Sequence, residues 1–465
     1  MNVSSDRVQF DAATSVLILG AGACGLVAGL AAAEQGAEVL IVERDRTPSG
    51  STAMSSGFIP APGTKAQRAL GIGDCPELFA ADLQAKSKWL GEPALVELAA
   101  RAIGPVLDWL EARHGFEWQV LQDFLYPGHS RHRMHTLAEK TGAALIARLL
   151  DAAGAAGIPI LTEAQATELH TVDSRIAGAT LLRPNGVQER VGCDAMILAC
   201  NGYGGNSALV AKHIPEMQRA PYYGHPGNTG DAVIWGEALD ADMRCLSACQ
   251  GHGSLATPHN ILISWALMME GGVQVNADGQ RFSNERQGYS EQALDVLAQP
   301  GSIAWCVFDQ RLRDLARNFP DFRQAEDAGA VLFARDADDL AEMIGAPTSA
   351  MKQTLESCVR CQSGEVECLF GRDFTGNPPL SPPYYAVKVT GALFHTQGGL
   401  MIGEDARVLR RDGTAFVNLF AGGGAACGVS GPHLSGYLSG NGLLTALAFG
   451  RLAGHHAGLL VKSAS

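Results

Sequence analysis

Two apolar runs near the start of the chain frame a glycine-rich turn. Val16–Leu19 leads directly into Gly20-x-Gly22-x-x-Gly25, an alanine-rich stretch follows, and a second run, Val39–Val42, ends at an acidic residue. This pattern predicts the order strand, turn, helix, strand. In such a unit the first glycine permits the tight turn, the second lets a pyrophosphate approach the backbone, and the third packs the helix on the strand. We therefore predict a dinucleotide-binding unit.

The residues after this unit indicate which dinucleotide it takes. Glu43 closes the second strand, where its carboxylate can accept hydrogen bonds from both ribose hydroxyls and would repel a 2′-phosphate. The pattern thus favours FAD or NAD. The loop Thr47–Gly57 is rich in small residues and hydroxyl groups, and we expect it to contact the ligand. The alternative is a flexible solvent loop.

Strand and helix signals return later in the chain. Residues 64–130 carry helical periodicity and are predicted to be a helical insertion. Two further apolar strands end in glycines, near Gly205 and Gly424, and a last helix is predicted for Gly440–Ala457. The N-terminus of that helix would favour an electron-rich ring edge that carries a carbonyl group.

The alternating pattern of strands and helices is absent between residues 246 and 379. The proline-rich stretch Pro378–Pro383 is the predicted linker through which the chain returns to the first domain. We predict an α/β fold with a discontinuous Rossmann-like domain, residues 1–245 and 380–465. A second domain is inserted at 246–379.

Composition excludes several classes of protein. A net charge of −13 and the lack of a basic run argue against a nucleic-acid partner. No transmembrane segment and no secretory leader are predicted, so we expect a cytoplasmic location. The 11 cysteines lack paired spacing. Cys358-x-x-Cys361 with Cys368 has no nearby histidine, so no metal site is predicted.

A short segment carries three histidines and two arginines between His129 and His135. The arginines, Arg131 and Arg133, are candidates to bind a substrate carboxylate, because a guanidinium does so with two hydrogen bonds. A solvated basic turn is an equal alternative.

Several motifs, in this order, resemble the FAD flavoproteins of the fumarate reductase and 3-ketosteroid dehydrogenase superfamily. Beyond the Gly20 motif with Glu43 and the Ser/Thr loop, the resemblance rests on the following stretches: Thr229-Gly230-Asp231, Asn276-x-x-Gly279-x-Arg281-Phe282-x-Asn284-Glu285, His395-Thr-x-Gly-Gly399 and Leu419-Phe-Ala-x-Gly423.

The resemblance implies a fold and a cofactor. The inserted domain would be an α+β cap, with the reaction cleft between cap and flavin, and the FAD would be noncovalent, because Ser51-Thr52 stands where histidyl-FAD members carry a histidine. The residues implied to bind FAD are Gly20, Gly22, Ala23, Gly25, Glu43, Arg44, Ser51, Thr52, Ser55, Gly57, Ala166, Asn201, Gly202, Asp231, Gly399, Gly423, Gly442 and Leu443.

Within this superfamily the chain departs from the fumarate reductases. The places where those enzymes carry a proton-donating arginine, an upstream glutamate and arginine, and a substrate-clamping arginine read Tyr289, Trp265, Met268 and Tyr437 here. Tyr289 and Tyr437 instead resemble two tyrosines of the 3-ketosteroid Δ1-dehydrogenases. Tyr126 is a weaker match to their third tyrosine.

The resemblance assigns these residues a desaturation mechanism. Tyr437 and the backbone N–H of Asn441, at a helix N-terminus, would stabilise the developing enolate oxygen. Tyr289 would remove the proton from the α-carbon, with Tyr126 or the positive cluster favouring its anion. The remaining residues predicted to bind substrate are His395, Trp265, His252, Arg131 and Arg133.

The leading hypothesis is therefore an FAD-dependent dehydrogenase that introduces a double bond α,β to the ketone of a cyclic substrate. That substrate is a 3-ketosteroid or a smaller ring such as a 4-oxocyclohexanecarboxylate, with a quinone, dye or oxygen as external electron acceptor. The alternative is a reductase of an activated double bond in a polar acid, similar to the fumarate and urocanate reductases. A third class, a flavin-storing protein without turnover, would show no dependence on either tyrosine.

Overall fold

The glycine-rich unit forms the middle of the largest sheet. In the computed structural model, which describes residues 2–5 and 8–464, β2 (Ala12–Leu19) lies between β10 (Gln188–Leu198) and β3 (Val39–Val42), and all three strands are parallel. Val16 to Ile18 are fully buried, because helices cover this part of the sheet. The predicted strand, turn, helix, strand order is therefore present.

This sheet has nine strands among the described residues, in the order β1-β8-β9-β10-β2-β3-β7, with β20 paired to β10 and β19 to β20. The strands β8, β9 and β10 form an antiparallel meander, whereas β7 is parallel to its neighbour β3 and β20 is parallel to its neighbour β10. The bounds of the outer strands are β1 Asn2–Ser4, β7 Ile160–Leu161, β8 Gln165–Val172, β9 Arg175–Leu182, β19 Arg407–Leu409 and β20 Ala415–Ala421.

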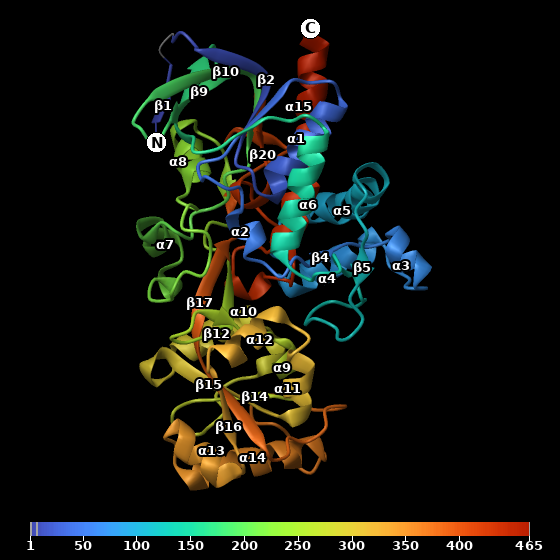
Figure 1. Ribbon diagram of the computed structural model, residues 1–465, viewed down its shortest axis with the longest axis vertical. Helices are drawn as coiled ribbons and strands as arrows, with labels where there is room; N and C mark the ends of the chain where they lie inside the picture. Colours follow the sequence, from blue (N-terminus) through green and yellow to red (C-terminus); the bar gives the residue numbers. More distant parts are fainter. Residues whose placement is uncertain (1, 6–7, 465) are drawn as a thin grey trace. The chain divides into compact units, whose positions relative to one another are not determined.

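Two helices pack closely beside this sheet. α1 (Ala23–Glu34) and α15 (Asn441–Ala464) lie side by side (Figure 1). A side chain at Gly450 would strike the carbonyl oxygen of Cys24 at 2.6 Å, so the glycine allows the two backbones to approach. The helix α6 (Gly142–Ala155) also packs against α1. Its N-cap is Thr141, whose hydroxyl accepts a hydrogen bond from the Ala144 amide.

The helical insertion consists of three helices and a small sheet. Thr64 and Gln67 form a capping box at the start of α3. The helices are α3 Lys65–Ala69, α4 Pro76–Lys86 and α5 Pro93–His114, and the sheet has the strands β4 Ile59–Pro60, β5 Gln119–Val120 and β6 Met134–Thr136. Unit 1 also contains α2 Gly50–Ala53, α7 Ser207–His213, α8 Asp231–Ala238, and β11 Met243–Arg244 paired with β18 Gly399–Leu400.

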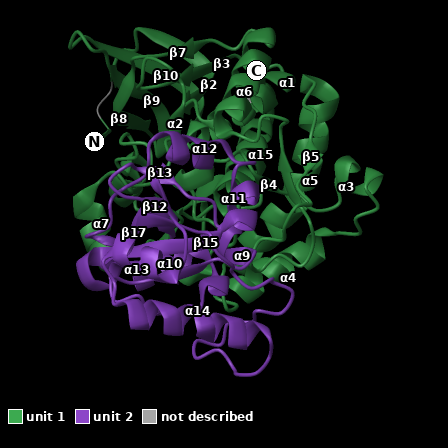
Figure 2. Ribbon diagram, turned by 60° about the horizontal axis from the view of Figure 1, so that its bottom comes forward, with its two compact units in different colours: residues 1–215, 224–249, 395–465 green, residues 216–223, 250–394 purple. Residues whose placement is uncertain are grey.

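The chain divides into two compact units, coloured separately in Figure 2. Unit 1 comprises residues 1–215, 224–249 and 395–465, and unit 2 comprises residues 216–223 and 250–394. The sequence predicts an inserted domain at 246–379. Unit 2 extends farther because the proline-rich stretch precedes β17 (Tyr384–Thr396), which pairs with β15 and β16 inside unit 2.

Unit 2 is built on a six-stranded sheet among the described residues, in the order β13-β12-β17-β15-β14 with β16 beside β17. Helices surround it, as an α+β arrangement requires. The elements are β12 Cys249–Ala256, β13 Ile261–Leu262, α9 Ala266–Met269, β14 Val273–Val275, α10 Tyr289–Leu297, β15 Ile303–Asp309, α11 Gln310–Ala316, α12 Pro320–Asp327, β16 Val331–Ala334, α13 Ala337–Ile344 and α14 Thr348–Gln362.

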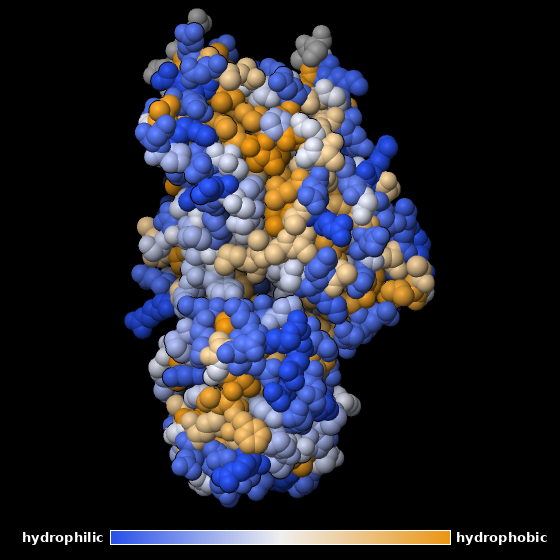
Figure 3. Space-filling model, viewed as in Figure 1, coloured by the Kyte–Doolittle hydropathy of each residue, from blue (hydrophilic) through white to orange (hydrophobic). Residues whose placement is uncertain are grey.

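The surface mixes hydrophilic and hydrophobic residues, as Figure 3 shows for one face. Among the residues that the structure describes, no helix combines the length and the apolar character that crossing a bilayer would need.

Candidate active site

The three motif glycines have different surroundings. Gly20 has φ +110°, and a Cβ there would lie 2.5 Å from the carbonyl oxygen of Ala199, while a Cβ on Gly25 would collide with the carbonyl oxygen of Gly20. The protein's own packing therefore requires glycine at both positions, at Gly20 against Ala199 and at Gly25 within the turn. A Cβ on Gly22 would meet only Thr52 Oγ1, at an ordinary 3.6 Å. The protein's own packing does not demand this glycine, so it leaves space for a ligand to approach the backbone, as a pyrophosphate does in this motif.

Glu43 is held in place by backbone amides. Its Oε2 accepts from the Ala21 N–H at 2.9 Å and its Oε1 from the Asp45 N–H at 3.0 Å. Each carboxylate oxygen keeps a second lone pair, which a ribose hydroxyl can use. The predicted role of Glu43 is chemically possible in this geometry.

The Ser/Thr loop joins the glycine turn through hydroxyl groups. Thr52 Oγ1 accepts from the Ala23 N–H at 3.1 Å. Ser51 Oγ accepts from the side-chain amides of Asn201, at 3.2 Å, and Asn228, at 2.8 Å. The loop is thus an ordered part of unit 1, and the flexible-loop alternative does not describe it.

The other predicted FAD-binding residues also lie in unit 1. Asp231 begins α8. Burial raises the pKa of its carboxyl group, and this effect exceeds that of the hydrogen bond from Thr229, which lowers the pKa. The guanidinium of Arg44 donates to the Gly227 carbonyl oxygen. The rest are Ser55 and Gly57 after α2, Ala166 in β8, Gly202 after β10, Gly399 in β18, Gly423 in the turn Gly423–Ala425, and Gly442 and Leu443 in α15.

A polar network surrounds the start of α15. The side-chain nitrogen Nε2 of Gln397 lies 2.9 Å from His395 Nδ1, and the side-chain oxygen Oε1 of Gln397 accepts from Ser430 Oγ at 2.8 Å. The Asn441 side-chain amide donates to the same Ser430 oxygen at 2.8 Å. Tyr437 lies edge-on to the His395 ring, with 5.6 Å between centroids. Gln397 and Ser430 were not predicted, although Gln397 is the variable position of the His395 motif.

His395 approaches the first turn of α15 because of a glycine. A Cβ on Gly442 would lie 2.8 Å from His395 Nε2. Burial lowers the pKa of His395 to about 4, although a hydrogen bond with the Thr396 carbonyl raises it. The imidazole is therefore neutral at physiological pH.

The predicted role of the Asn441 backbone N–H needs correction. This amide already donates to the Leu438 carbonyl oxygen at 3.1 Å, so it is not a free donor for a substrate oxygen. Among the described residues, the side-chain oxygen of Asn441 has no hydrogen-bond partner although the residue is fully buried. A buried acceptor without a partner at a helix N-terminus fits a site that a polar ligand completes.

Tyr126 belongs to the same region. Its ring contacts Phe124 at 4.7 Å between centroids, and burial together with the nearby Tyr437 raises its pKa. Tyr126 is thus a neutral phenol that can donate a hydrogen bond, and its role in favouring the anion of Tyr289 stays a prediction.

In unit 2, His252 and Tyr289 form the centre of an aromatic cluster. Their rings stack with centroids 4.5 Å apart and an interplanar angle of 13°. Trp265 meets His252 edge-on at 5.8 Å, and Phe394 lies 5.2 Å from it. Phe394 was missed by sequence reasoning. His252, a predicted substrate-binding residue, lies in β12, and burial lowers its pKa to about 3.

A buried ionic cluster holds the aromatic cluster in place. Glu285 binds Arg281 at 2.6 Å and Arg372 at 2.9 Å, and its backbone carbonyl accepts from Trp265 Nε1 at 3.1 Å. Four residues later Tyr289 begins α10. The Arg281-Phe282-x-Asn284-Glu285 motif is therefore a scaffold for Trp265 and Tyr289.

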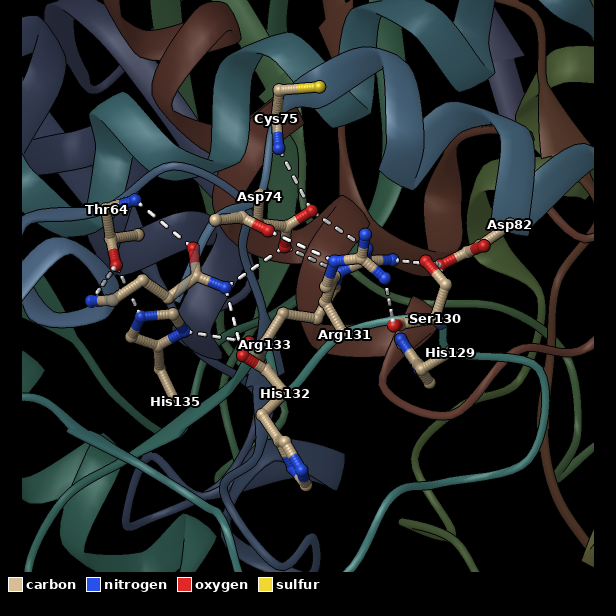
Figure 4. A network of polar contacts seen from close by, with 12 residues as sticks. Thr64, Asp74, Cys75, Asp82, His129, Ser130, Arg131, His132, Arg133 and His135 are labelled. Carbon is tan, nitrogen blue, oxygen red and sulfur yellow. Dashed lines mark hydrogen bonds and ion pairs between the residues drawn. The ribbon is translucent and has the colours of Figure 1, made fainter. Parts of the chain in front are cut away.

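The basic segment does not behave as predicted. The Arg133 guanidinium is fully buried and binds both carboxylate oxygens of Asp74 at 2.9 Å and Asp82 at 2.5 Å (Figure 4). Arg131 is exposed and donates to the carbonyl oxygens of Gly73 and Ser130. Arg133 therefore has its charge compensated inside unit 1, which argues against the predicted carboxylate-binding role.

Two of the three histidines of this segment, His129 and His135, are structural as well. His129 Nε2 lies 3.0 Å from the Ser439 carbonyl oxygen, just before α15. His135 contacts Thr64 Oγ1 at 2.7 Å. Burial lowers the pKa of His129 to about 3 and that of His135 to about 4. No group of three or more potential metal ligands occurs in the part of the chain that the structure describes.

The family model described as "FAD binding domain" matches residues 15–443. The chain belongs to the FAD binding domain family. Membership agrees with the space above Gly22, the hydroxyl-rich loop and the acidic residue that closes β3. This family member binds FAD and is an oxidoreductase.

Relatives from two branches of the family are similar to this chain. A probable fumarate reductase, Ifc3, of Shewanella frigidimarina is 30% identical over 450 residues, which cover 96% of this chain and 74% of Ifc3. The 3-oxosteroid 1-dehydrogenase of Mycolicibacterium smegmatis is 26% identical over 557 residues, which cover 94% and 96%. The structure of the open conformation of a flavocytochrome c3 fumarate reductase superposes with a TM-score of 0.82 and 29% identity, over 97% of this chain and 79% of that one.

Proposed function

We propose that this FAD-dependent oxidoreductase acts on a carbon–carbon bond conjugated to a carbonyl group, in the direction of reduction, and that its substrate is not a dicarboxylate. Over the whole chain the reductase relative is more similar than the steroid dehydrogenase, at 30% against 26% identity. This supports the alternative hypothesis, a reductase of an activated double bond, over the leading hypothesis of a cyclic-ketone dehydrogenase. The residues at the expected reaction positions restrict the substrate.

The observation that carries the proposal is the neutrality of the candidate side chains. Tyr289 and Tyr437 occupy the places where the fumarate reductases carry arginines, and the histidines His252 and His395 are neutral because burial lowers their pKa values to about 3 and about 4. A dicarboxylate needs compensating cations to leave water, because burying an unpaired charge is costly. A neutral enone or a similarly activated double bond does not.

In this proposal the chain supplies polarisation and a proton. Tyr437 donates a hydrogen bond to the substrate carbonyl oxygen. Such donors stabilise the negative charge that develops on that oxygen. Bound FAD supplies hydride chemistry at the β-carbon. Tyr289 donates its hydroxyl proton to the α-carbon and regains a proton from water.

The protonation state of a tyrosine at neutral pH favours the direction of reduction. An unperturbed phenol has a pKa of about 10 and is a proton donor, not a base, at neutral pH. Desaturation would need a cation that stabilises a phenolate, and Arg133 of the positive cluster is already neutralised by Asp74 and Asp82. The same side chains are therefore better suited to protonating a carbanion than to removing an α-proton.

The second candidate is the cyclic-ketone dehydrogenase. It is favoured by one observation, the pair Tyr289 and Tyr437, which resembles two tyrosines of the 3-ketosteroid Δ1-dehydrogenases. Its substrate would be a 3-ketosteroid or a smaller oxo-cyclohexane, and an external acceptor would reoxidise the flavin.

An anaerobic flavin assay separates the two. The holoenzyme is reduced with one equivalent of dithionite and mixed with cyclohexenone, urocanate or fumarate, while the oxidised holoenzyme is mixed with cyclohexanone, 4-oxocyclohexanecarboxylate or a 3-ketosteroid. Rapid return of the oxidised flavin spectrum with the enone, and none with fumarate, is expected. Rapid bleaching by a saturated ketone without reoxidation by any enone would replace the proposal by the second candidate. Reoxidation by fumarate alone would overturn the substrate restriction, and no response in either arm would overturn both.

A further inference from the structure

Three cysteines gather at the end of α14 in unit 2. Cys358 and Cys361 stand three residues apart on this helix, and Cys368 follows in the loop after it. Cys358 is buried, whereas the other two are partly exposed. The Cys361 thiol shares a hydrogen bond with the Cys368 thiol. The two side chains are thus neighbours, and both are partly exposed to solvent.

Cys368 has the surroundings of a thiolate. Arg281 donates from Nη1 to Cys368 Sγ at 3.3 Å. Backbone N–H groups of Phe370 and Arg372 add two further donors. The guanidinium is itself locked, since Glu285 binds it at 2.9 and 2.6 Å and only 8% of the Arg281 side chain is exposed. A fixed cation and three donors stabilise negative charge on the Cys368 sulfur.

The three thiols differ in acidity. Burial would raise the pKa of Cys368, but the hydrogen bonds from Arg281 and from the backbone outweigh it and hold the pKa below its usual value. Burial raises the pKa of Cys361, and it raises that of Cys358 to about 11. One reactive sulfur therefore lies beside a neutral thiol that can attack it.

We propose that Cys368 is a peroxide-sensitive thiolate and that Cys361 resolves its oxidised form into a Cys361–Cys368 disulfide. The Cys368 thiolate attacks one oxygen of hydrogen peroxide, the O–O bond breaks, and sulfenic acid and hydroxide form. The Cys361 thiol then attacks this sulfur, the S–O bond breaks, and water leaves. Two thiols lose two electrons and hydrogen peroxide is reduced to two water molecules. Reduction by a dithiol reverses the change.

Alkylation rates test the first step. Holoenzyme is treated with iodoacetamide at about pH 6.5, below the usual thiol pKa of about 8.5, and each cysteine is quantified by peptide mass spectrometry. Cys368 is expected to react roughly tenfold faster than Cys361 or than the partly exposed Cys75. Cys358, in the same helix, serves as the buried control. Equal rates at Cys368 and Cys75 would overturn the thiolate assignment.

Peroxide treatment tests the second step. Cys361 and Cys368 fall on one tryptic peptide, residues 361–372, whereas Cys358 falls on the preceding one. After peroxide and alkylation the 361–372 peptide is expected to lose the mass of two hydrogen atoms and to regain it with dithiothreitol. In Cys361→Ser the sulfenic acid at Cys368 should persist and be trapped by dimedone, and in Cys368→Ser no oxidation of this peptide should occur. Trapping at Cys368 in the unaltered protein, without disulfide, would overturn the resolving role of Cys361. Oxidation of Cys361 in Cys368→Ser would overturn the order of attack.

Discussion

The candidate residues of unit 1 and unit 2 reach a similar electrostatic state by different means. At the start of α15 in unit 1, His395, Gln397, Ser430 and Asn441 form a chain of hydrogen bonds of 2.8 to 2.9 Å. In unit 2, His252 is enclosed by the rings of Tyr289, Trp265 and Phe394. One histidine is embedded in a polar network and the other in an aromatic cluster, yet burial keeps both neutral.

In the proposed function, the two clusters have different chemical roles. A hydrogen-bond network fixes donors in direction, which suits the polarisation of a carbonyl oxygen. Stacked rings present flat apolar surface and exclude water, which suits an uncharged carbon skeleton. Each unit also has a buried cluster of ion pairs that supports its structure. In unit 1 Arg133 binds two carboxylates, and in unit 2 Glu285 binds two guanidinium groups.

The largest effect is expected from the two tyrosine hydroxyls. Tyr289→Phe should lower the single-turnover rate of flavin reoxidation by about 10²- to 10⁴-fold, because a general acid is lost. Tyr437→Phe should lower it by about 10²- to 10³-fold, because one donor to the oxygen is lost. Stopped-flow absorbance measures both, with FAD affinity and melting temperature as controls. Rates within about twofold of the unaltered protein would refute the assignment.

A second prediction concerns the ionic support in unit 1. Arg133→Met leaves Asp74 and Asp82 buried without a cation, so the free energy of unfolding should fall by about 3–5 kcal/mol. Urea denaturation followed by circular dichroism measures it. Combining Arg133→Met with Asp74→Asn and Asp82→Asn should restore much of the loss, since the uncompensated charges are removed. A loss below about 0.5 kcal/mol would show that the cluster is not a support.

Acid should weaken unit 1 more than unit 2. His129, His135 and His395 have pKa values of about 3, 4 and 4 in unit 1, against His252 at about 3 in unit 2, all lowered first by burial. An unfolded histidine has a pKa of about 6.5, so the unfolded state binds more protons below that pH. Their contribution is complete above about pH 6.5 and falls by up to about 1.4 kcal/mol per group and pH unit as the pH drops toward 4.

Hydrogen exchange at pH 7 and pH 5, corrected for the intrinsic rates, measures this difference by segment. Protection should fall more in α15 and β6 than in β12 and α10. His395→Gln should reduce the loss in α15. Equal loss in both units would contradict the assignment of the buried neutral histidines.

The smallest effect is expected at Arg131. Its guanidinium is exposed and donates only to backbone carbonyl oxygens within unit 1. Arg131→Ala should change the free energy of unfolding by less than about 0.5 kcal/mol and leave the affinity for ring carboxylates unchanged. Isothermal titration with 4-oxocyclohexanecarboxylate checks it. An affinity loss above about tenfold would support the original prediction that Arg131 binds the substrate carboxylate.

Local patterns predicted the elements whose geometry depends on neighbours in the chain. The strand and helix around Gly20 and Gly25 follow from the apolar runs and the glycine spacing, so they could be identified directly, whereas the contact of Gly20 with Ala199 depends on the tertiary structure. The expected reaction positions of Tyr289 and Tyr437 came from motif spacing and stay predictions. That spacing could not tell whether the Asn441 amide was free, because its acceptor depends on the conformation of the preceding turn.

The sequence by itself determined the dinucleotide-binding unit, the family and the neutral residues at the expected reaction positions. Only the tertiary structure decided that Arg133 is a compensated structural charge, that His252 stacks on Tyr289, and that Gln397 and Ser430 link His395 to Asn441. Arg133 lies 59 residues from Asp74, and His135 lies 71 from Thr64. Such partners meet through packing, and burial then sets the charge of each group, which no local pattern of residues specifies.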